Sequence, residues 1–541
     1  MRRWINILPF FAWCYLVLYL IELQIVKHRN YTIKAKSQHE QKVTLVAKRG
    51  NIYDRKGRPL AISLKAYSIY AVTRYVKNQK RTAMKLAQLR LRSYRKIQSL
   101  LRRKKFFWVK KKVSEDIATK IKDLNLPGIG VIEDYLRVYP QGDCLKNLIG
   151  IVSCDNRGLA GIEFQFDSLL RGEDGFAIFQ KKPSGRGYPY PHYPMLEPRP
   201  GADLYLTIDL DLQILLYDIL KDARDKYRSG KTGGIIIDPQ SGKILAMVNV
   251  NGGSCHNSVV SDEFEPGSTF KIVTLASALI EGLNLDEKID VSGGKIKIYG
   301  HTIHDFRDYG ILNLKGVFVH SSNVGAVKIG KRIRPGIFFQ TARSLGFGNL
   351  TGILLPGEAK GKIYRPAEMG RMRYANNCFG QGVTVTLLQL TNSYAAIASG
   401  GRLYRPMIVE EIRESKRVYA FKPFLIRRVL NLDICEKIKE VLAAVVDTGT
   451  GKLARNEVFK ICGKTGTAQK AGVGGYLPDR IITSFCGFFP KDDPQYVVGI
   501  MLDEPDVGKW ASQITAPIFG TIVASMIRMP DILPEYYVYA R

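Results

Sequence analysis

The stretch EPGSTFKIVTLASALIEG at Glu265–Gly282 decides how the surrounding chain is interpreted. Its Pro266-Gly267 pair predicts a turn, after which we expect Ser268 to open a helix that Gly282 stops. Ser268 and Lys271 are three residues apart, so their side chains lie on one face of that helix. The rest of the helix has an apolar face that is expected to be buried. This face carries Ile272, Leu275, Ala276, Leu279 and Ile280.

A serine and a lysine on one helical face can act together as a nucleophile and its base. A lysine amine can take the serine proton when burial or a nearby cation lowers its pKa. A helix N-terminus also favours negative charge on the serine side. The S-x-x-K spacing alone means little, because Ser93–Lys96 (SYRK) fits it too. That copy lacks the Pro-Gly turn, and we interpret it as chance.

Two later motifs supply further groups for such a pair. Ser321–Asn323 (SSN) places a hydroxyl and an amide two residues apart, although a serine there could simply cap a helix. Lys464–Gly466 forms K-T-G within CGKTGTAQ, whereas a second K-T-G at Lys231–Gly233 precedes Ser268 and is set aside. The order S-x-x-K, S-x-N, K-T-G resembles the motif set of penicillin-binding proteins and class A β-lactamases.

Other catalytic schemes find less support in the sequence. His301 and His304 form an H-x-x-H pair, but no acidic pattern nearby completes a zinc site. No G-x-S-x-G elbow and no Walker loop occurs. The eight cysteines contain no C-x-x-C pair, which argues against a metal ribbon. We therefore expect neither a metal nor another cofactor.

The chain around these motifs mixes strand and helix signals. LYLTIDLDLQILLYDIL predicts a strand and then a helix, and GGIIIDPQSGKILAMVNV predicts two strands joined by a turn at Asp238–Gly242. Another strand pair is expected near Lys464 and Val497. This mixture predicts an α+β domain over residues 201–541. Residues 27–200 are expected to form a separate, strand-rich domain that ends in a Pro- and Tyr-rich linker at Tyr188–Gly201.

A hydrophobic run precedes both domains. WINILPFFAWCYLVLYLIELQIV at residues 4–26 is long enough to cross a bilayer of about 30 Å. No small-residue cleavage site follows it, so we expect a retained anchor rather than a removed signal peptide. Basic residues flank both ends, so charge does not decide the orientation. Residues 1–3 form a short tail that is easily kept in the cytoplasm while the rest is exported.

Charge is the exceptional feature of the composition. Lys and Arg number 81 against 49 Asp and Glu, which gives a net charge of +32. Residues 74–112 hold many basic residues and no acidic one, and the interspersed apolar residues predict an amphipathic helix in part of the segment. Such a segment either faces a membrane or another partner, or is a plain solvated face. No nucleic-acid partner is expected, because zinc-finger, helix-turn-helix and RNA-binding signatures are absent.

Further motifs resemble those of the class B penicillin-binding proteins. KRGNIYDRKGRPLA at Lys48–Ala61, YLRVYPQG at Tyr135–Gly142 and GLAGIEFQFDSLLRG at Gly158–Gly172 are similar to motifs of that family's pedestal domain. GGYLPDRIITSFCGFFP and APIFG near the end favour the division-specific (septal) type over the elongation type. The resemblance covers nearly the whole chain. It implies one transmembrane helix, an elongated pedestal (dimerisation) domain and a serine β-lactamase-like transpeptidase domain, in which helices flank an antiparallel sheet.

The resemblance implies a role for each catalytic motif residue. Ser268 is the expected nucleophile, which attacks the penultimate D-Ala carbonyl of a pentapeptide stem, and Lys271 is its general base. Ser321 and Asn323 are expected to assist proton transfer and substrate placement. Lys464 is expected to support the proton relay and the substrate carboxylate.

The residues around Lys464 are implied to bind the substrate. Thr465, Gly466 and Thr467 form the expected binding segment, with the two threonines on the carboxylate of the stem or of a β-lactam. The backbone N–H groups of Ser268 and Thr467 are expected to form the oxyanion hole. A neighbouring stem's amine then resolves the acyl-enzyme into a cross-link.

The implied protein is a peptidoglycan D,D-transpeptidase of cell division. Its implied partners are stem peptides ending in D-Ala-D-Ala, β-lactam antibiotics, the membrane, a polytopic glycosyltransferase and other division proteins. The implied location is the bacterial inner membrane, with one span, a cytoplasmic N-terminus and a periplasmic catalytic domain. Three alternatives stay open: an elongation-type transpeptidase, a D,D-carboxypeptidase or β-lactamase-like hydrolase, and an inactive scaffold of the division machinery.

Overall fold

Two compact units make up the computed structural model, which describes residues 7–31, 40–181, 187–189, 195–298, 300–472 and 475–530. The first unit combines Met1–Gly50, Ser63–Val138 and Arg171–Ala202. The second combines Asn51–Ile62, Tyr139–Leu170 and Asp203–Arg541. Both units are therefore assembled from separate pieces of chain. The expected linear domain boundaries after residues 26 and 200 stay a prediction.

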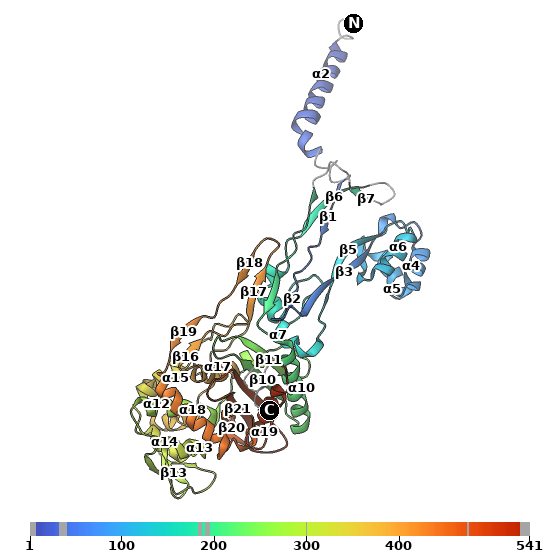
Figure 1. Ribbon diagram of the computed structural model, residues 1–541. Coiled ribbons are helices and arrows are strands. Elements are labelled where there is room, and N and C mark those ends of the chain that lie inside the picture. The colour runs from blue at the N-terminus through green and yellow to red at the C-terminus, as the bar shows by residue number, and fades with distance from the viewer. Residues whose placement is uncertain are drawn as a thin grey trace. The chain divides into compact units, whose positions relative to one another are not determined.

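The first unit begins with an apolar helix (Figure 1). Helix α2 spans Ile7–Ile21 and continues into one π-helical turn, η1, at Glu22–Val26. The stretch Pro9–Val26 has a mean hydropathy of 1.7 and is long and apolar enough to cross a membrane. The first three residues of the expected anchor, and the tail at residues 1–3, lie outside the described part of the chain.

A four-stranded sheet follows the apolar helix. β1 (Glu40–Leu45) pairs antiparallel with β6 (Gly175–Lys181), which also pairs with β7 (Gly187–Pro189) and β8 (Met195–Leu196). β8 lies within the stretch expected to be a linker and β7 overlaps the start of that stretch, so part of it is strand because it pairs with β6. Residues 190–194 of that stretch lie outside the described residues.

The remainder of the first unit is a second sheet that carries three helices. The strands of this sheet that lie in the first unit are β4 (Phe106–Val113), β5 (Ile129–Val138) and most of β3 (Pro59–Val72), and β3 pairs with the other two. Its helices are α4 (Gln79–Gln88), α5 (Tyr94–Arg103) and α6 (Glu115–Asp123). Leu86 of α4 and Ile97 and Leu101 of α5 lie in the apolar core of this part. The prediction of an amphipathic helix within residues 74–112 is thus confirmed.

A five-stranded antiparallel sheet organises the second unit, in the order β11-β10-β22-β21-β20. Its strands are β10 (Lys231–Ile237), β11 (Ile244–Val250), β20 (Cys462–Gly472), β21 (Gly475–Phe489) and β22 (Tyr496–Asp503). The predicted strand pair with its turn forms β10 and β11. The strands predicted near the K-T-G motif and Val497 form β20 and β22, so these expectations are confirmed.

Helices cover both faces of this sheet (Figure 1). The covering helices are α10 (Leu210–Tyr227) and α19 (Thr515–Ile527) on one face and α17 (Leu387–Ala398) on the other. Two successive glycines of β10 show that α17 and α10 lie on opposite faces of the sheet, because successive side chains of a strand point to opposite faces. A Cβ on Gly233 would touch a leucine of α17, whereas one on Gly234 would lie 2.5 Å from a leucine of α10. The α+β architecture with helices flanking an antiparallel sheet is confirmed.

The helix that carries Lys271 begins differently from the expectation. Gly267–Phe270 forms a 3₁₀ turn, η4, and the α-helix α12 runs only from Lys271 to Ile280. Ser268 therefore lies in the 3₁₀ turn. The reason is tertiary, since the N–H of Gly267 donates 3.0 Å to the Gly380 carbonyl and the turn is held against another segment. Gly282, with a φ of +83°, follows the helix end as predicted.

Shorter elements complete the second unit. Its other strands are β2 (Ile52–Tyr53), β9 (Asp203–Leu206), β12 (Lys288–Asp290), β13 (Lys295–Ile298), β14 (His301–His304), β15 (Ile311–Asn313), β16 (Arg402–Tyr404), β17 (Val409–Arg413), β18 (Val418–Ala420) and β19 (Leu425–Arg428). Its other helices are α7 (Lys146–Ile149), α8 (Gly161–Gln165), α9 (Asp167–Leu170), α11 (Ser258–Ser261), α13 (Leu314–Val319), α14 (Asn323–Gly330), α15 (Pro335–Ser344), α16 (Arg371–Asn377) and α18 (Leu432–Asp447). The segments between β13 and α14 border the cavity described next.

Candidate active site

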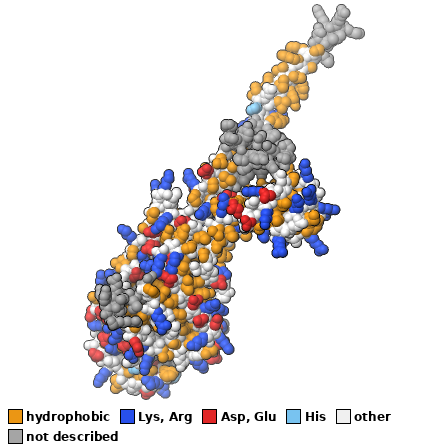
Figure 2. Space-filling model, turned by 45° about the vertical axis from the view of Figure 1, so that its right-hand side comes forward, with side chains coloured by type: hydrophobic (Ala, Val, Ile, Leu, Met, Phe, Trp, Pro, Cys, Tyr) orange, Lys and Arg blue, Asp and Glu red, His pale blue; other side chains and the backbone are white. Residues whose placement is uncertain are grey.

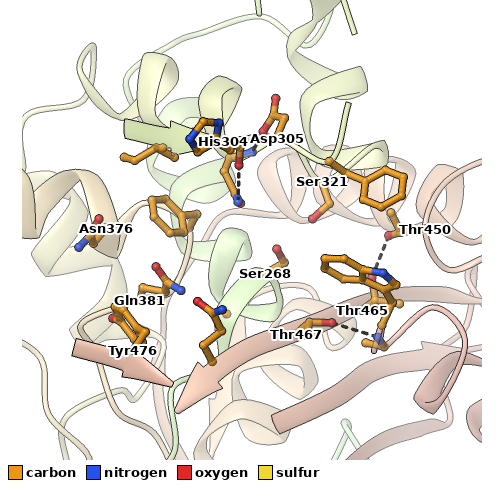
Figure 3. A pocket seen from close by; sticks show the side chains of 18 of the residues that line it. Ser268, His304, Asp305, Ser321, Asn376, Gln381, Thr450, Thr465, Thr467 and Tyr476 are labelled. Atoms are coloured by element: carbon orange, nitrogen blue, oxygen red, sulfur yellow. Dashed lines mark hydrogen bonds between the residues drawn. The ribbon is translucent and has the colours of Figure 1, made fainter. Parts of the chain in front are cut away.

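A cavity of about 950 Å³ opens in the second unit (Figure 3). Ser268 from η4, Ser321 and Asn323 from the start of α14, and Thr465 and Thr467 from β20 all line it. These residues are separated by up to about 200 positions in the chain, and the fold brings them to one place. Figure 3 shows Ser268, Ser321, Thr465 and Thr467, each with a side-chain hydroxyl, around the cavity.

The turn that carries Ser268 is packed tightly against β20. Gly267 has a φ of +53°, and a Cβ on it would lie 2.8 Å from the Thr467 carbonyl oxygen. Only glycine fits this left-handed position and this close approach. Gly466 is required for the same contact, since its Cβ would lie 2.7 Å from the Pro266 carbonyl oxygen. The two glycines thus let the serine turn and the K-T-G strand lie side by side.

Lys271 is fully buried beneath the cavity. Its Nζ donates to the Ser321 carbonyl at 2.7 Å, to Asn323 Oδ1 at 2.8 Å and to the Ser322 carbonyl at 3.2 Å, and it lies 3.3 Å from Ser321 Oγ. Burial lowers the pKa of this amine well below its ordinary value, and the charge of Lys464 lowers it further, against the opposing effect of Asp305. An amine with so low a pKa can be neutral and accept a proton.

Lys464 approaches the same hydroxyl from β20. Its Nζ donates to Ser321 Oγ at 2.9 Å and to the Thr465 carbonyl at 3.3 Å. Burial lowers the pKa of Lys464 to about 7. Ser321 Oγ therefore joins two buried amines, and a proton can pass between them through this hydroxyl.

Ser321 reaches this position through an unusual backbone conformation. Its φ is +60°, in the left-handed region that residues other than glycine seldom adopt. Ser322, the next residue, is the one that caps α14, by accepting the N–H of Gly325 at 2.8 Å. The capping interpretation of the SSN segment thus applies to Ser322, and Ser321 and Asn323 are left to face the cavity and Lys271.

Asp305 holds this segment in place. Its Oδ2 accepts from Ser322 Oγ at 2.5 Å, and its Oδ1 accepts from the backbone N–H groups of Asn323 at 2.5 Å and Val324 at 3.0 Å. A carboxylate at the N-terminus of α14 is favoured by the helix dipole. Asp305 also lines the cavity. No sequence motif singles it out, because its partners are 17 to 19 residues away in the chain.

The two threonines of β20 are fixed by side-chain hydrogen bonds (Figure 3). Thr465 Oγ1 lies 2.8 Å from Thr450 Oγ1, and Thr467 Oγ1 accepts from the Ala511 N–H at 3.0 Å. Both threonines line the cavity, and their hydroxyls are preset donors or acceptors for an anionic group. Gly466 lies between them and is not one of the lining residues, so its contribution is the close packing described above.

Two sequence profiles match the chain. The Penicillin binding protein transpeptidase domain matches residues 232–524, which is more than half of the chain, and the Penicillin-binding Protein dimerisation domain matches residues 44–206. The chain belongs to the penicillin-binding protein family. The resemblance to class B penicillin-binding proteins drawn from the motifs is therefore confirmed, as is the two-domain organisation that it implied.

Individual penicillin-binding proteins resemble the chain over most of its length. Stage V sporulation protein D of Bacillus subtilis (strain 168) is 33% identical, over 96% of this chain and 83% of that protein. Peptidoglycan D,D-transpeptidase FtsI of Escherichia coli (strain K12) is 30% identical, over 90% of this chain and 84% of that protein. The crystal structure of penicillin-binding protein 3 from Mycobacterium tuberculosis complexed with aztreonam has a TM-score of 0.71 and 27% identity, over 91% of this chain and 98% of that chain.

The motifs missed two features of this penicillin-binding protein, one beside the cavity and one in its lining. Glu265, three residues before Ser268, accepts from the Gly382 N–H at 3.0 Å and from the Tyr476 hydroxyl at 3.2 Å. Phe306 and Trp510 line the cavity and make an edge-to-face contact with ring centroids 5.5 Å apart. Glu265 could have been suspected from its place beside the Pro-Gly turn, but the aromatic pair joins segments that no local pattern connects.

Histidines of the H-x-x-H pair also lie in this cavity. His301 and His304 line it, at the two ends of β14. Within the described residues, no group of three or more His, Cys, Asp or Glu side chains is placed to hold a metal ion.

Proposed function

We propose that this chain is a peptidoglycan D,D-transpeptidase that cross-links stem peptides through an acyl-serine intermediate on Ser268, in cell division. The observation that carries the proposal is the cluster formed by Ser321 Oγ with the buried amines of Lys271 and Lys464, 3.3 Å and 2.9 Å away, at the cavity that Ser268 lines. Membership in the penicillin-binding protein family, and the names of the Escherichia coli and Mycobacterium tuberculosis relatives, support the same reaction.

Acylation starts at the hydroxyl of Ser268. Burial lowers the pKa of Lys271 and so favours its neutral form, and the neutral amine takes the hydroxyl proton as Oγ attacks the penultimate D-Ala carbonyl. The backbone N–H groups of Ser268 and Thr467 stabilise the tetrahedral oxyanion. Ser321 passes the proton to the departing D-Ala amine as the C–N bond breaks, and the stem remains as an ester on Ser268.

Deacylation repeats these steps with a different nucleophile. The amine of a neighbouring stem attacks the ester carbonyl, and its proton returns to Ser268 Oγ as the C–O bond breaks. The product is an amide cross-link, and no external oxidant or reductant is consumed. Asn323, held 2.8 Å from Lys271 Nζ, places the stem amide beside the reacting centre.

The substrate carboxylate lies against β20 in this mechanism. Thr465 and Thr467 present hydroxyls to the cavity, and Lys464 adds positive charge when it is protonated, which its pKa of about 7 allows. A β-lactam carries a carboxylate in the corresponding position, so the same groups would bind it. Penicillin would then acylate Ser268 and leave the enzyme blocked.

The protein is proposed to act at the inner membrane. Helix α2 and the turn η1 form the single span, the N-terminal tail is cytoplasmic and the chain that follows the span is periplasmic. The length and hydropathy of Pro9–Val26 support the span. A polytopic glycosyltransferase and other division proteins are the proposed partners.

Covalent labelling tests the nucleophile. The full-length protein should form an adduct with fluorescent penicillin, and Ser268→Ala should form none. Ser93→Ala is a matched control, because Ser93 begins the other S-x-x-K match and should be labelled like the wild type. Labelling of Ser268→Ala, or none of the wild type, would refute the assignment. In a reaction with stem peptides, release of D-Ala without cross-linked dimers would favour a hydrolase instead.

A further inference from the structure

The positive charge of the protein is concentrated in one part of the first unit. Residues 63–138 hold 20 Lys and Arg against 5 Asp and Glu, so these 76 residues carry +15 of the net charge of +32. A uniform preference for basic residues would spread the charge in proportion to length. The proposed reaction uses none of these residues, so the concentration requires another explanation.

The basic residues of this part lie on its outside. Within residues 74–112, thirteen Lys and Arg side chains are exposed on α4, α5, β4, the segment just before α4 and the connections between these elements, and we call this the basic surface. Figure 2 shows Lys and Arg side chains gathered over this part of the first unit. In the described chain, none of the thirteen forms an ion pair with a carboxylate. Among the described residues, no ion pair therefore offsets the mutual repulsion of these thirteen side chains, and this repulsion favours an external anion.

Apolar side chains are exposed among these cations. Met84, Tyr94 and Phe106 are 54%, 37% and 46% exposed. Met84 and Tyr94 line an open groove whose other lining residues include Lys80 and Arg81. A mixture of basic and partly exposed apolar side chains is typical of surfaces that adsorb at the headgroup region of a bilayer.

The arrangement fits a lipid surface better than a single bound group. The exposed cations extend over two helices, a strand and the segments that lead to them, and they do not converge on one closed pocket. A layer of mobile anionic headgroups can match such an array, with a contribution from each Lys and Arg near the surface. The candidate span at Pro9–Val26 belongs to the same chain and would keep a bilayer at high effective concentration.

We propose that the basic surface docks on anionic lipid headgroups of the membrane that holds the N-terminal helix. This inference rests on the membrane anchoring in the proposed function. Docking would restrict how the first unit moves relative to the bilayer. It is independent of the acylation chemistry, because the basic surface and the cavity belong to different units.

Hydrogen exchange of the full-length protein in lipid nanodiscs tests the docking. Discs of phosphatidylcholine alone are compared with discs that contain about 30% phosphatidylglycerol. Peptides from α4, α5 and the start of β4 should exchange at least about tenfold more slowly in the anionic discs, and 0.5 M NaCl should remove the difference because screening weakens surface attraction. Equal exchange in the two kinds of disc would overturn the proposal.

Charge-neutralised variants test the surface itself. Replacing Arg95, Lys96, Arg102 and Arg103 of α5 by Gln should abolish the protection. The matched control neutralises four exposed lysines of the second unit, Lys288, Lys295, Lys297 and Lys331, and should keep the protection. Protection that survives in the α5 variant would overturn the proposal.

Two further measurements distinguish a failure of the docking proposal from a failure of the proposed enzyme or of the membrane anchor. Fluorescent-penicillin labelling of each sample reports the proposed enzyme independently of docking, and recovery in nanodiscs reports the anchor. An acidic protein segment is the alternative ligand of the basic surface, and adding poly-glutamate to phosphatidylcholine discs tests it. Protection by poly-glutamate without protection by anionic lipid would overturn the lipid proposal in favour of that partner.

Discussion

Lys464 Nζ donates a 2.9 Å hydrogen bond to Ser321 Oγ, and the same oxygen lies 3.3 Å from Lys271 Nζ. One hydroxyl therefore connects two amines that are both buried. Two buried ammonium groups this close would repel each other without a full counter-charge, so the pair favours loss of a proton. The reactivity of Lys271 and the pH dependence of folding both follow from this relationship.

Replacing Lys271 should separate general-base catalysis from simple positive charge. Lys271→Ala is expected to slow acylation by β-lactam by about 10²–10⁴-fold, the usual worth of a general base. Lys271→Arg should fail to restore the rate, because a guanidinium stays protonated. The measurement is the second-order rate constant of acylation, with circular dichroism to confirm folding. A wild-type rate for the arginine variant would mean that charge alone is needed.

Lys464 should make folding stability depend on pH. Its pKa falls from 10.5 to about 7 on folding, so the unfolded chain binds more protons between these values, and stability should rise with pH across this window. The contribution is at most about 1.4 kcal/mol per pH unit. Lys271 is shifted in the same direction and adds to the rise.

Thermal unfolding at pH 7 and pH 9 measures this effect. The increase in melting temperature should be smaller in Lys464→Met than in the wild type. The exposed Lys331→Met variant should retain the wild-type increase. An unchanged increase in Lys464→Met would show that the amine is not protonated differently in the folded and unfolded states.

Asp305 is expected to be a positioning residue for the SSN segment. Asp305→Asn keeps an oxygen for the backbone N–H groups but replaces the acceptor of Ser322 Oγ by a donor, so the segment should shift. We expect about tenfold slower acylation and a loss of about 1–3 kcal/mol in stability. Asp308→Asn is a control, since Asp308 accepts from two glycine N–H groups in a nearby loop without touching the segment. Equal effects of both variants on acylation would contradict this role.

Glu265 is expected to hold the serine turn against β21. It joins the turn to Gly382 and to Tyr476, and burial raises the pKa of its carboxyl group. Glu265→Ala should slow acylation by about tenfold, as expected for the loss of hydrogen bonds worth about 1.4 kcal/mol. Tyr476→Phe removes only one of these bonds and should cost less. A larger loss in Tyr476→Phe than in Glu265→Ala would show that the tyrosine acts on its own.

Local sequence determined the parts of the protein that depend on near neighbours. The apolar run to residue 26, the strand pair at β10 and β11, and the S-x-x-K spacing each follow from periodicity, turn residues or helical geometry within a few positions. The motif order then indicated the family, because three short patterns in one order rarely coincide by chance. The exception is the 3₁₀ turn at Ser268, which a contact with Gly380 imposes.

Tertiary structure alone decided the pKa values and the hydrogen-bond geometry of the motif residues. The low pKa of Lys464 results from burial of its amine. The φ of +60° at Ser321 depends on tertiary packing that the residues next to it in the sequence do not predict. Asp305 and Glu265 were missed because an isolated carboxylate has no pattern until distant segments supply its N–H and O–H partners. Short-range sequence specifies elements and reactive groups, whereas desolvation and hydrogen-bond geometry arise only when residues 17 to 211 positions apart pack together.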